Sequence, residues 1–165
     1  MSKPGAEPAS ENRFPAFLVL WGSQTLSLFG TMVTQFAANV WLVRDLYPLP
    51  TQKPQLALAL TALGIASTAP LIFGMPLAGA FADRHDRQRI LVVANSVLAV
   101  LTAMLVALSF AHRLTLPLAA LLLVLYAFAS SFHSAAFDSS YGRFVAPDEL
   151  PRAGGMMMTS YALAQ

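Results

Sequence analysis

Long stretches of apolar residues, separated by short polar segments, dominate this chain. A helix needs roughly 20 apolar residues to cross the hydrocarbon core of a bilayer, and four uncharged stretches reach that length. A further stretch begins near residue 155. The sequence therefore predicts an all-α integral membrane protein, with a helix bundle of four transmembrane helices and the start of a fifth. The four predicted spans are residues 14–43, 55–82, 90–111 and 114–137.

Composition supports the membrane assignment and excludes several functions. Hydrophobic residues make up 56% of the chain and charged residues 11%, whereas a soluble domain has about 25% charged residues. Cysteine is absent and the net charge is only +2, from scattered arginines. No metal-ligand spacing, phosphate loop or nucleophile arrangement occurs. We expect no metal, no cofactor, no nucleic-acid partner and no enzymatic activity.

The first span carries a polar stripe. At 100° per residue, Gln24, Thr31, Gln35 and Asn39 fall on one side of the helix, and large apolar residues such as Phe29 fall on the other. Unpaired amides are costly in hydrocarbon. The stripe therefore either forms hydrogen bonds between helices or lines a water-filled cavity that holds a substrate. Both can hold at different depths.

The second span contains small residues at near-helical spacing, which allow another helix to approach closely. Two prolines within it are expected to kink the helix. The small residues are Gly64, Ser67, Gly74, Ala78 and Gly79, and the prolines are Pro70 and Pro76.

Charge is concentrated between the second and third spans, and basic residues near span ends set membrane orientation. Most of the basic residues would lie on the same side of the membrane as the N-terminus, which predicts that this side is cytoplasmic. Residues 1–13 would then form a disordered cytoplasmic tail. That side has Lys3, Arg13, Arg84, Arg87, Arg89, Arg143 and Arg152, and the opposite side has Arg44, Lys53 and Arg113.

Residues 79–90 read Gly-Ala-Phe-Ala-Asp-Arg-His-Asp-Arg-Gln-Arg-Ile. They resemble the signature Gly-x-Leu-Ala-Asp-Arg-x-Gly-Arg-Arg/Lys-x-Ile/Leu, which lies between the second and third helices of major facilitator superfamily transporters. Asp86 replaces the usual Gly and Gln88 the usual base. The Asp-Arg-x-Asp-Arg form is typical of a branch similar to the enterobactin exporter and macrolide efflux proteins. Residues 17–24, through 41–43, are similar to the first helix of the same branch. Residues 137–138, followed by 145–153, resemble the end of its fourth helix and the loop after it, with Ala146 at a usual Pro and Gly154 at a usual Asn.

The resemblance implies a fold of twelve helices in two six-helix halves. Residues 14–165 would form part of the N-terminal half, so we expect an N-terminal fragment whose C-terminal half is missing. The antiporter signature Gly-x-x-x-Gly-Pro of the fifth helix would fall beyond Gln165.

The resemblance also implies roles for charged residues. Gly79 would allow close approach of helices at the turn, and Asp83 would bind a helix N-terminus in the second half as a conformational latch. Arg84 and Arg87 would neutralise Asp83 or pair with Asp138. An ionisable group within a span is a functional candidate, so His133 and Asp138 are candidate proton sites, although His133 also fits a packing role. For Asp86 and Arg89, a solvated loop position is favoured.

The sequence thus predicts a multi-pass protein of the cell membrane, plasma or inner. Its function would be secondary active efflux of drug-like or siderophore-like small molecules by alternating access, with the bilayer and a coupling proton as partners. Lysophospholipid or other lipid transport by the same fold, and a scaffold without transport, stay open as alternatives. A small four-helix transporter is disfavoured because residues 14–43 contain no acidic residue.

Overall fold

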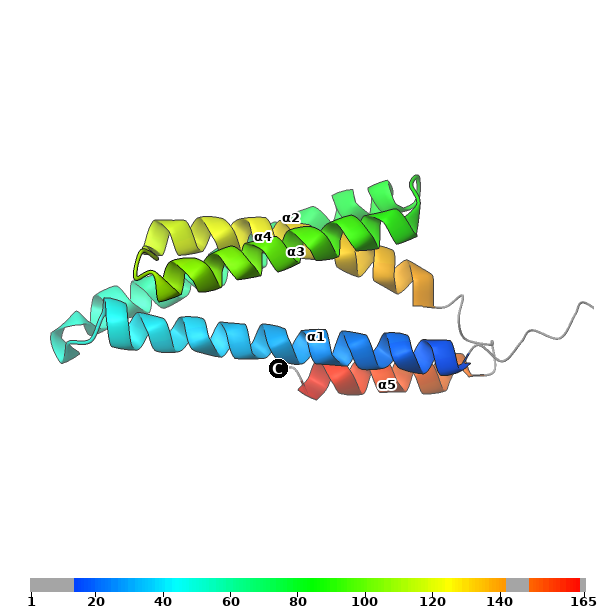
Figure 1. Cartoon of the computed structure of the whole chain (residues 1–165), viewed down its shortest axis with the longest axis horizontal. Coiled ribbons are helices and arrows are strands. Elements are labelled where there is room, and N and C mark those ends of the chain that lie inside the picture. The colour runs from blue at the N-terminus through cyan, green and yellow to red at the C-terminus, as the bar shows by residue number, and fades with distance from the viewer. Residues whose placement is uncertain (1–13, 142–148, 164–165) are drawn as a thin grey trace, which may run out of the picture. The chain divides into compact units, whose positions relative to one another are not determined.

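The structure, a computed structural model, describes residues 14–141 and 149–163, and all the regular structure within them is helical (Figure 1). The all-α membrane fold predicted from the sequence is confirmed. The predicted tail, residues 1–13, lies outside the described residues. The α-helices are α1 (Phe14–Trp41), α2 (Lys53–Ala82), α3 (Arg87–Phe110), α4 (Leu116–Tyr141) and α5 (Leu150–Leu163), and shorter helical turns cover Leu42–Leu46 and Pro50–Gln52.

Proline lies in the first turn of α2, α4 and α5. Pro54, Pro117 and Pro151 each follow directly after the first residue of their helix. Proline is tolerated there because the N–H that it lacks would have no partner within the helix. The sequence placed the start of the fifth helix near residue 155, and α5 instead begins at Leu150. Likewise α4 continues past Asp138, which was expected to close it, to Tyr141.

Both ends of α3 are fixed by local interactions. The Asp86 side chain precedes the helix and accepts a hydrogen bond from the Gln88 N–H at 2.9 Å, so α3 begins at Arg87, three residues before the predicted start. At the other end the His112 N–H donates to the Ser109 carbonyl and the Arg113 N–H to the Leu108 carbonyl, both at 3.0 Å. This pair of bonds is a Schellman motif. It places His112 at a φ of 52°.

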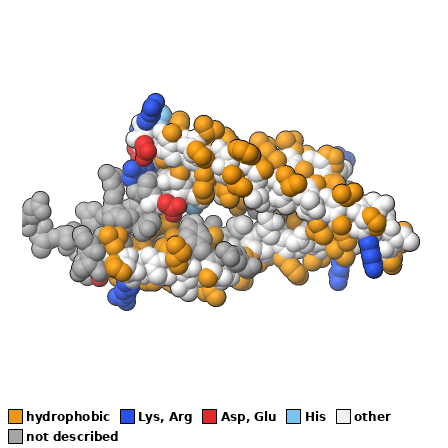
Figure 2. All heavy atoms as spheres, turned by 180° about the vertical axis from the view of Figure 1, so that it is seen from behind, with side chains coloured by type: hydrophobic (Ala, Val, Ile, Leu, Met, Phe, Trp, Pro, Cys, Tyr) orange, Lys and Arg blue, Asp and Glu red, His pale blue; other side chains and the backbone are white. Residues whose placement is uncertain are grey.

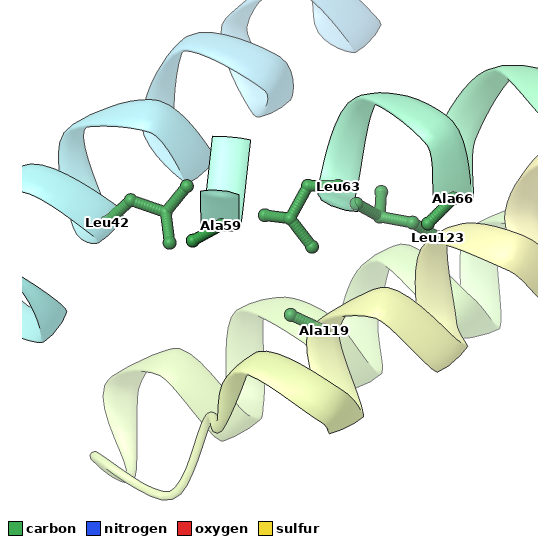
Figure 3. Packing of buried hydrophobic residues seen from close by; sticks show 6 residues of the cluster. All are labelled: Leu42, Ala59, Leu63, Ala66, Ala119 and Leu123. Atoms are coloured by element: carbon green, nitrogen blue, oxygen red, sulfur yellow. The ribbon is translucent and has the colours of Figure 1, made fainter. Parts of the chain in front are cut away.

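The helices form two compact units, residues 1–37 with 140–165 and residues 38–139. In the second unit, α2 and α4 pack through a core of small and branched side chains, and Leu42 closes one end of it (Figure 3). A second cluster lies where α2 ends and α3 begins, and consists of Ala82, Ile90 and Ala136. The residues of the first core are Leu42, Ala59, Leu63, Ala66, Ala119 and Leu123.

The helices α2 and α4 pack closely at Gly74. A Cβ at this position would lie 2.6 Å from Ser131 Oγ and 3.3 Å from Phe128 Cδ2. Ser131 is fully buried and its hydroxyl donates to the Phe128 carbonyl at 2.7 Å. Among the small residues of the second span, Gly74 is therefore the one at which close approach depends on a missing side chain. Gly64 and Gly79 have nothing within 4 Å of such a Cβ in the described part of the chain.

Apolar side chains cover much of the outer surface shown in Figure 2, and charged side chains are few among them. Phe73 is 76% exposed and Phe110 is 83% exposed. Within the described residues, four helical segments are long and apolar enough to cross a membrane: Phe17–Leu46, Pro50–Ala82, Arg87–Phe110 and Leu116–Asp138. An outward-facing apolar surface of this extent requires lipid as its solvent.

Candidate functional site

The candidate site is the turn between α2 and α3, which holds the charged signature. The α2 helix closes with the Asp83 N–H donating to the Gly79 carbonyl at 3.1 Å and the Arg84 N–H donating to the Phe81 carbonyl at 3.2 Å. Asp86 then caps α3. The two helices are thus joined by only four residues, 83–86. The turn is short because backbone groups at the end of α2 and at the start of α3 form their hydrogen bonds with residues of the signature itself.

Asp83 and Arg87 form an ion pair across this turn, with Asp83 Oδ1 4.0 Å from Arg87 Nη2. The Asp83 side chain is 75% exposed, whereas that of Arg87 is 31% exposed. An exposed ion pair contributes only about 0–1 kcal/mol. Asp83 can therefore exchange this partner for another at little cost, which is the property that a latch requires.

Close approach of helices at Gly79, which the resemblance implied, stays a prediction. A Cβ there would meet open space among the described residues. The reason is geometric: Gly74 and Ala78 are one turn apart and share the buried face of α2, and Gly79 is rotated 100° away from Ala78.

Asp86 is more than a solvated loop residue because it caps α3, whereas the Arg89 side chain is 87% exposed. Asp86 Oδ1 caps α3, and its Oδ2 lies 3.7 Å from Arg89 Nε. A carboxylate at a helix N-terminus also interacts favourably with the helix dipole. The departure of Asp86 from the family's usual Gly thus has a structural reason, which the position of an Asp directly before a helix indicates in the sequence.

His133 and Asp138 both lie on α4. The His133 ring is half-buried and stacks on Phe137, with centroids 6.0 Å apart and an interplanar angle of 18°. The Asp138 side chain is exposed. The stacking supports the packing role that the sequence left open for His133. Pairing of Asp138 with Arg84 or Arg87 stays a prediction.

The polar stripe of α1 is only partly covered. Gln24 and Thr31 are half-buried, whereas Gln35 and Asn39 are exposed. The Thr31 hydroxyl donates to the Ser27 carbonyl at 3.1 Å on its own helix. Because the exposed amides lie toward the C-terminal end of α1, that end is where a wet surface is expected.

Sequence reasoning missed the polar contacts that join α1 to α5 in the first unit. Trp21 Nε1 donates to the Met156 carbonyl at 3.1 Å, and the Thr25 and Ser160 hydroxyls are 2.9 Å apart. The Arg152 guanidinium lies 4.9 Å from the centroid of the Phe14 ring. An indole within an apolar run signals that an acceptor is needed, but nothing in the sequence indicates which carbonyl supplies it.

Metal binding has no support in the described residues, among which no group of three or more His, Asp or Glu side chains could hold a metal ion. Most of the described side-chain hydrogen bonds lie within one helix, and those of Trp21 and Thr25 join α1 to α5.

Comparison with known proteins shows a match to the family described as transmembrane secretion effectors over residues 7–165. The chain is also similar to macrolide efflux protein A of Streptococcus pyogenes, with 24% identity over 139 residues, and equally to that protein from a serotype M6 strain. These matches cover 84% of this chain and 32% of the relatives, so the chain spans about a third of their length. No solved structure matches.

Proposed function

The chain belongs to the transmembrane secretion effectors, a major facilitator family, and from this we propose that it is the N-terminal part of a secondary active exporter of small organic molecules. The observation that carries the proposal is the family match over residues 7–165, together with the paired Asp83 and Arg87 in the turn that bears the signature. The similarity to proteins named for macrolide efflux supports export of drug-like molecules. We place the protein in the cell membrane with its N-terminus in the cytoplasm.

In the proposed mechanism, Asp83 biases the equilibrium between two conformations. In one conformation it pairs with Arg87, as in this structure. In the other it binds a helix N-terminus in the remainder of the transporter, where about half a positive charge is exposed. A proton taken up at Asp138 would change which partners Arg84 and Arg87 hold. Differences of a few kcal/mol suffice to shift such an equilibrium.

Replacement of Asp83 by Asn in the full-length protein tests this proposal. Loss of a charged hydrogen bond costs about 1.5–3 kcal/mol, so we expect efflux from loaded cells to slow roughly tenfold or more, with membrane insertion unchanged. Asp45→Asn is the matched control, because Asp45 is an exposed aspartate in the turn after α1. Equal efflux by Asp83→Asn and the control would remove the latch from the mechanism.

Cysteine labelling tests the cavity role of the α1 stripe. The 165 residues contain no cysteine, so single cysteines at Gln24, Gln35 and Asn39 can be introduced without other changes in this part of the protein. In membranes, these positions are expected to react with a water-soluble thiol reagent faster than cysteines at Phe29 and Val33. Faster reaction at Phe29 and Val33 would show that the opposite face of α1 is wet.

A further inference from the structure

A pocket of about 480 Å³ opens on the second unit beside the charged turn. Its volume lies within the range of roughly 300–1,000 Å³ that is common for ligand sites. The edge-to-face contact of Phe81 with Phe132, at a centroid distance of 5.7 Å, joins α2 to α4 at this pocket. Its apolar wall includes Phe81, Ile90, Val93, Ala94, Val97 and Phe132.

The rim of the pocket is polar at one end only. His85, Asp86 and Arg89 line it there, where α3 begins, while the wall along α3 is apolar as far as Val97. The His85 ring stacks on Phe81, with centroids 3.9 Å apart, and its Nδ1 donates to the Phe81 carbonyl at 3.0 Å. This hydrogen bond fixes the ring at the rim and leaves Nε2 for another partner.

Asp86 and Arg89 balance each other at the rim, and the excess of arginine around the rim favours an acidic group. The Asp86 side chain already accepts a hydrogen bond from the Gln88 N–H. Both side chains of its ion pair with Arg89 are exposed, and that of Arg89 is 87% exposed. Such a pair is weak, so Arg89 can turn to an added anion while Asp86 continues to cap α3. Residues 83–89 carry Arg84, Arg87 and Arg89 against Asp83 and Asp86.

We propose that this pocket holds one acyl chain of an acidic phospholipid, whose phosphate contacts Arg89. The apolar wall matches an acyl chain, and the charged rim lies at the end of the span, where the headgroup layer begins. An added transmembrane helix would match the apolar wall, but it would bring Arg89 no anion beyond Asp86, whose ion pair with Arg89 is exposed. The inference does not depend on export, because lipid binding is measured without transport.

Native mass spectrometry of the full-length protein, released from detergent, tests this site with dioleoyl phosphatidylglycerol and dioleoyl phosphatidylcholine. The unmodified protein should retain the acidic lipid about fivefold more than the zwitterionic one, as expected for one arginine near an acidic headgroup at about 1 kcal/mol. Arg89→Gln should abolish this preference. Arg84→Gln should preserve it, because Arg84 lies in the same turn but does not line the pocket.

Val93→Trp and Val92→Trp form a matched pair for the apolar wall. The two valines are similarly exposed, at 62% and 60%, but only Val93 lines the pocket. Val93→Trp should lower retention of both lipids and Val92→Trp should not. Equal retention by the two variants, or equal retention of the two lipids by the unmodified protein, would overturn the proposal. So would loss of thermal stability without loss of lipid in Val93→Trp, which would indicate that another protein segment fills the pocket.

Discussion

The contact between Gly74 and Ser131 predicts that a single added methyl group destabilises the packing of α2 against α4. In Gly74→Ala the new Cβ would lie 2.6 Å from Ser131 Oγ and 3.2 Å from Ser131 Cβ. Real Cβ contacts are longer than the first of these distances, so the Ser131 side chain or its helix must shift. Overpacking of this kind costs about 1–3 kcal/mol, while replacing Gly by Ala within a helix contributes about 1 kcal/mol in the opposite direction.

Gly64→Ala separates these two contributions. Gly64 lies on the same helix, and a Cβ there meets nothing within 4 Å among the described residues, so only the favourable helix propensity should act. We therefore expect Gly74→Ala to be less stable than Gly64→Ala by about 1–3 kcal/mol. The assay is unfolding of the full-length protein in mixed micelles by titration with dodecyl sulfate, followed by circular dichroism.

Ser131→Ala in the Gly74→Ala background provides the second half of the test. It removes the Oγ at 2.6 Å, and this hydroxyl donates only within α4, to Phe128. The double variant should recover about half or more of the lost stability, which a double-mutant cycle measures as a coupling energy of about 0.5–3 kcal/mol. Equal stability of Gly74→Ala and Gly64→Ala, or additive effects at positions 74 and 131, would refute the packing argument.

Two further substitutions test the ends of α3. His112 has a φ of 52°, a conformation that costs most non-glycine residues about 1–2 kcal/mol, so His112→Gly should raise the free energy of unfolding by about 1 kcal/mol and His112→Val should lower it. The reverse order in the same titration would contradict the Schellman geometry. Asp86→Ala should lower it by about 1 kcal/mol through loss of the N-cap, whereas Asp86→Asn, which retains the acceptor, should be close to the unmodified protein. Similar losses in both Asp86 variants would mean that charge, not capping, is what matters there.

The sequence was sufficient for the helices and for the family, because both depend on local patterns. Uncharged runs longer than a bilayer predict spans without any knowledge of neighbours, and the signature at residues 79–90 is contiguous. The ends of the helices were harder to predict from the sequence, because proline is common both in loops and in the first turn of a helix. The fifth helix was expected to begin near residue 155, but it begins at Leu150 and includes Pro151 in its first turn.

Contacts between helices could not be predicted from the sequence. Five small residues in the second span were equivalent candidates for close approach, and the placement of Ser131 opposite Gly74 distinguishes Gly74 from Gly64 and Gly79. Likewise, the pairing of Trp21 with the Met156 carbonyl joins residues 135 positions apart. Such pairings depend on how helices are oriented about their axes, which an apolar run with side chains of similar hydropathy on all sides does not specify.

The length of α2 has a consequence for the thickness of the bilayer that it occupies. With 30 residues at 1.5 Å per residue, the helix is about 45 Å long, whereas the hydrocarbon core is about 30 Å thick. To lie wholly within the core it would need to tilt by roughly 48°, beyond the range of about 0–40° seen for transmembrane helices. The ends of α2, at Lys53 and at Ala82 beside the charged turn, therefore reach the headgroup layers on both sides. In a thinner membrane, the ends of α2 would stay in the headgroup layers if the tilt of α2 increased. The tilt of α4 would then follow, because Gly74 packs against α4.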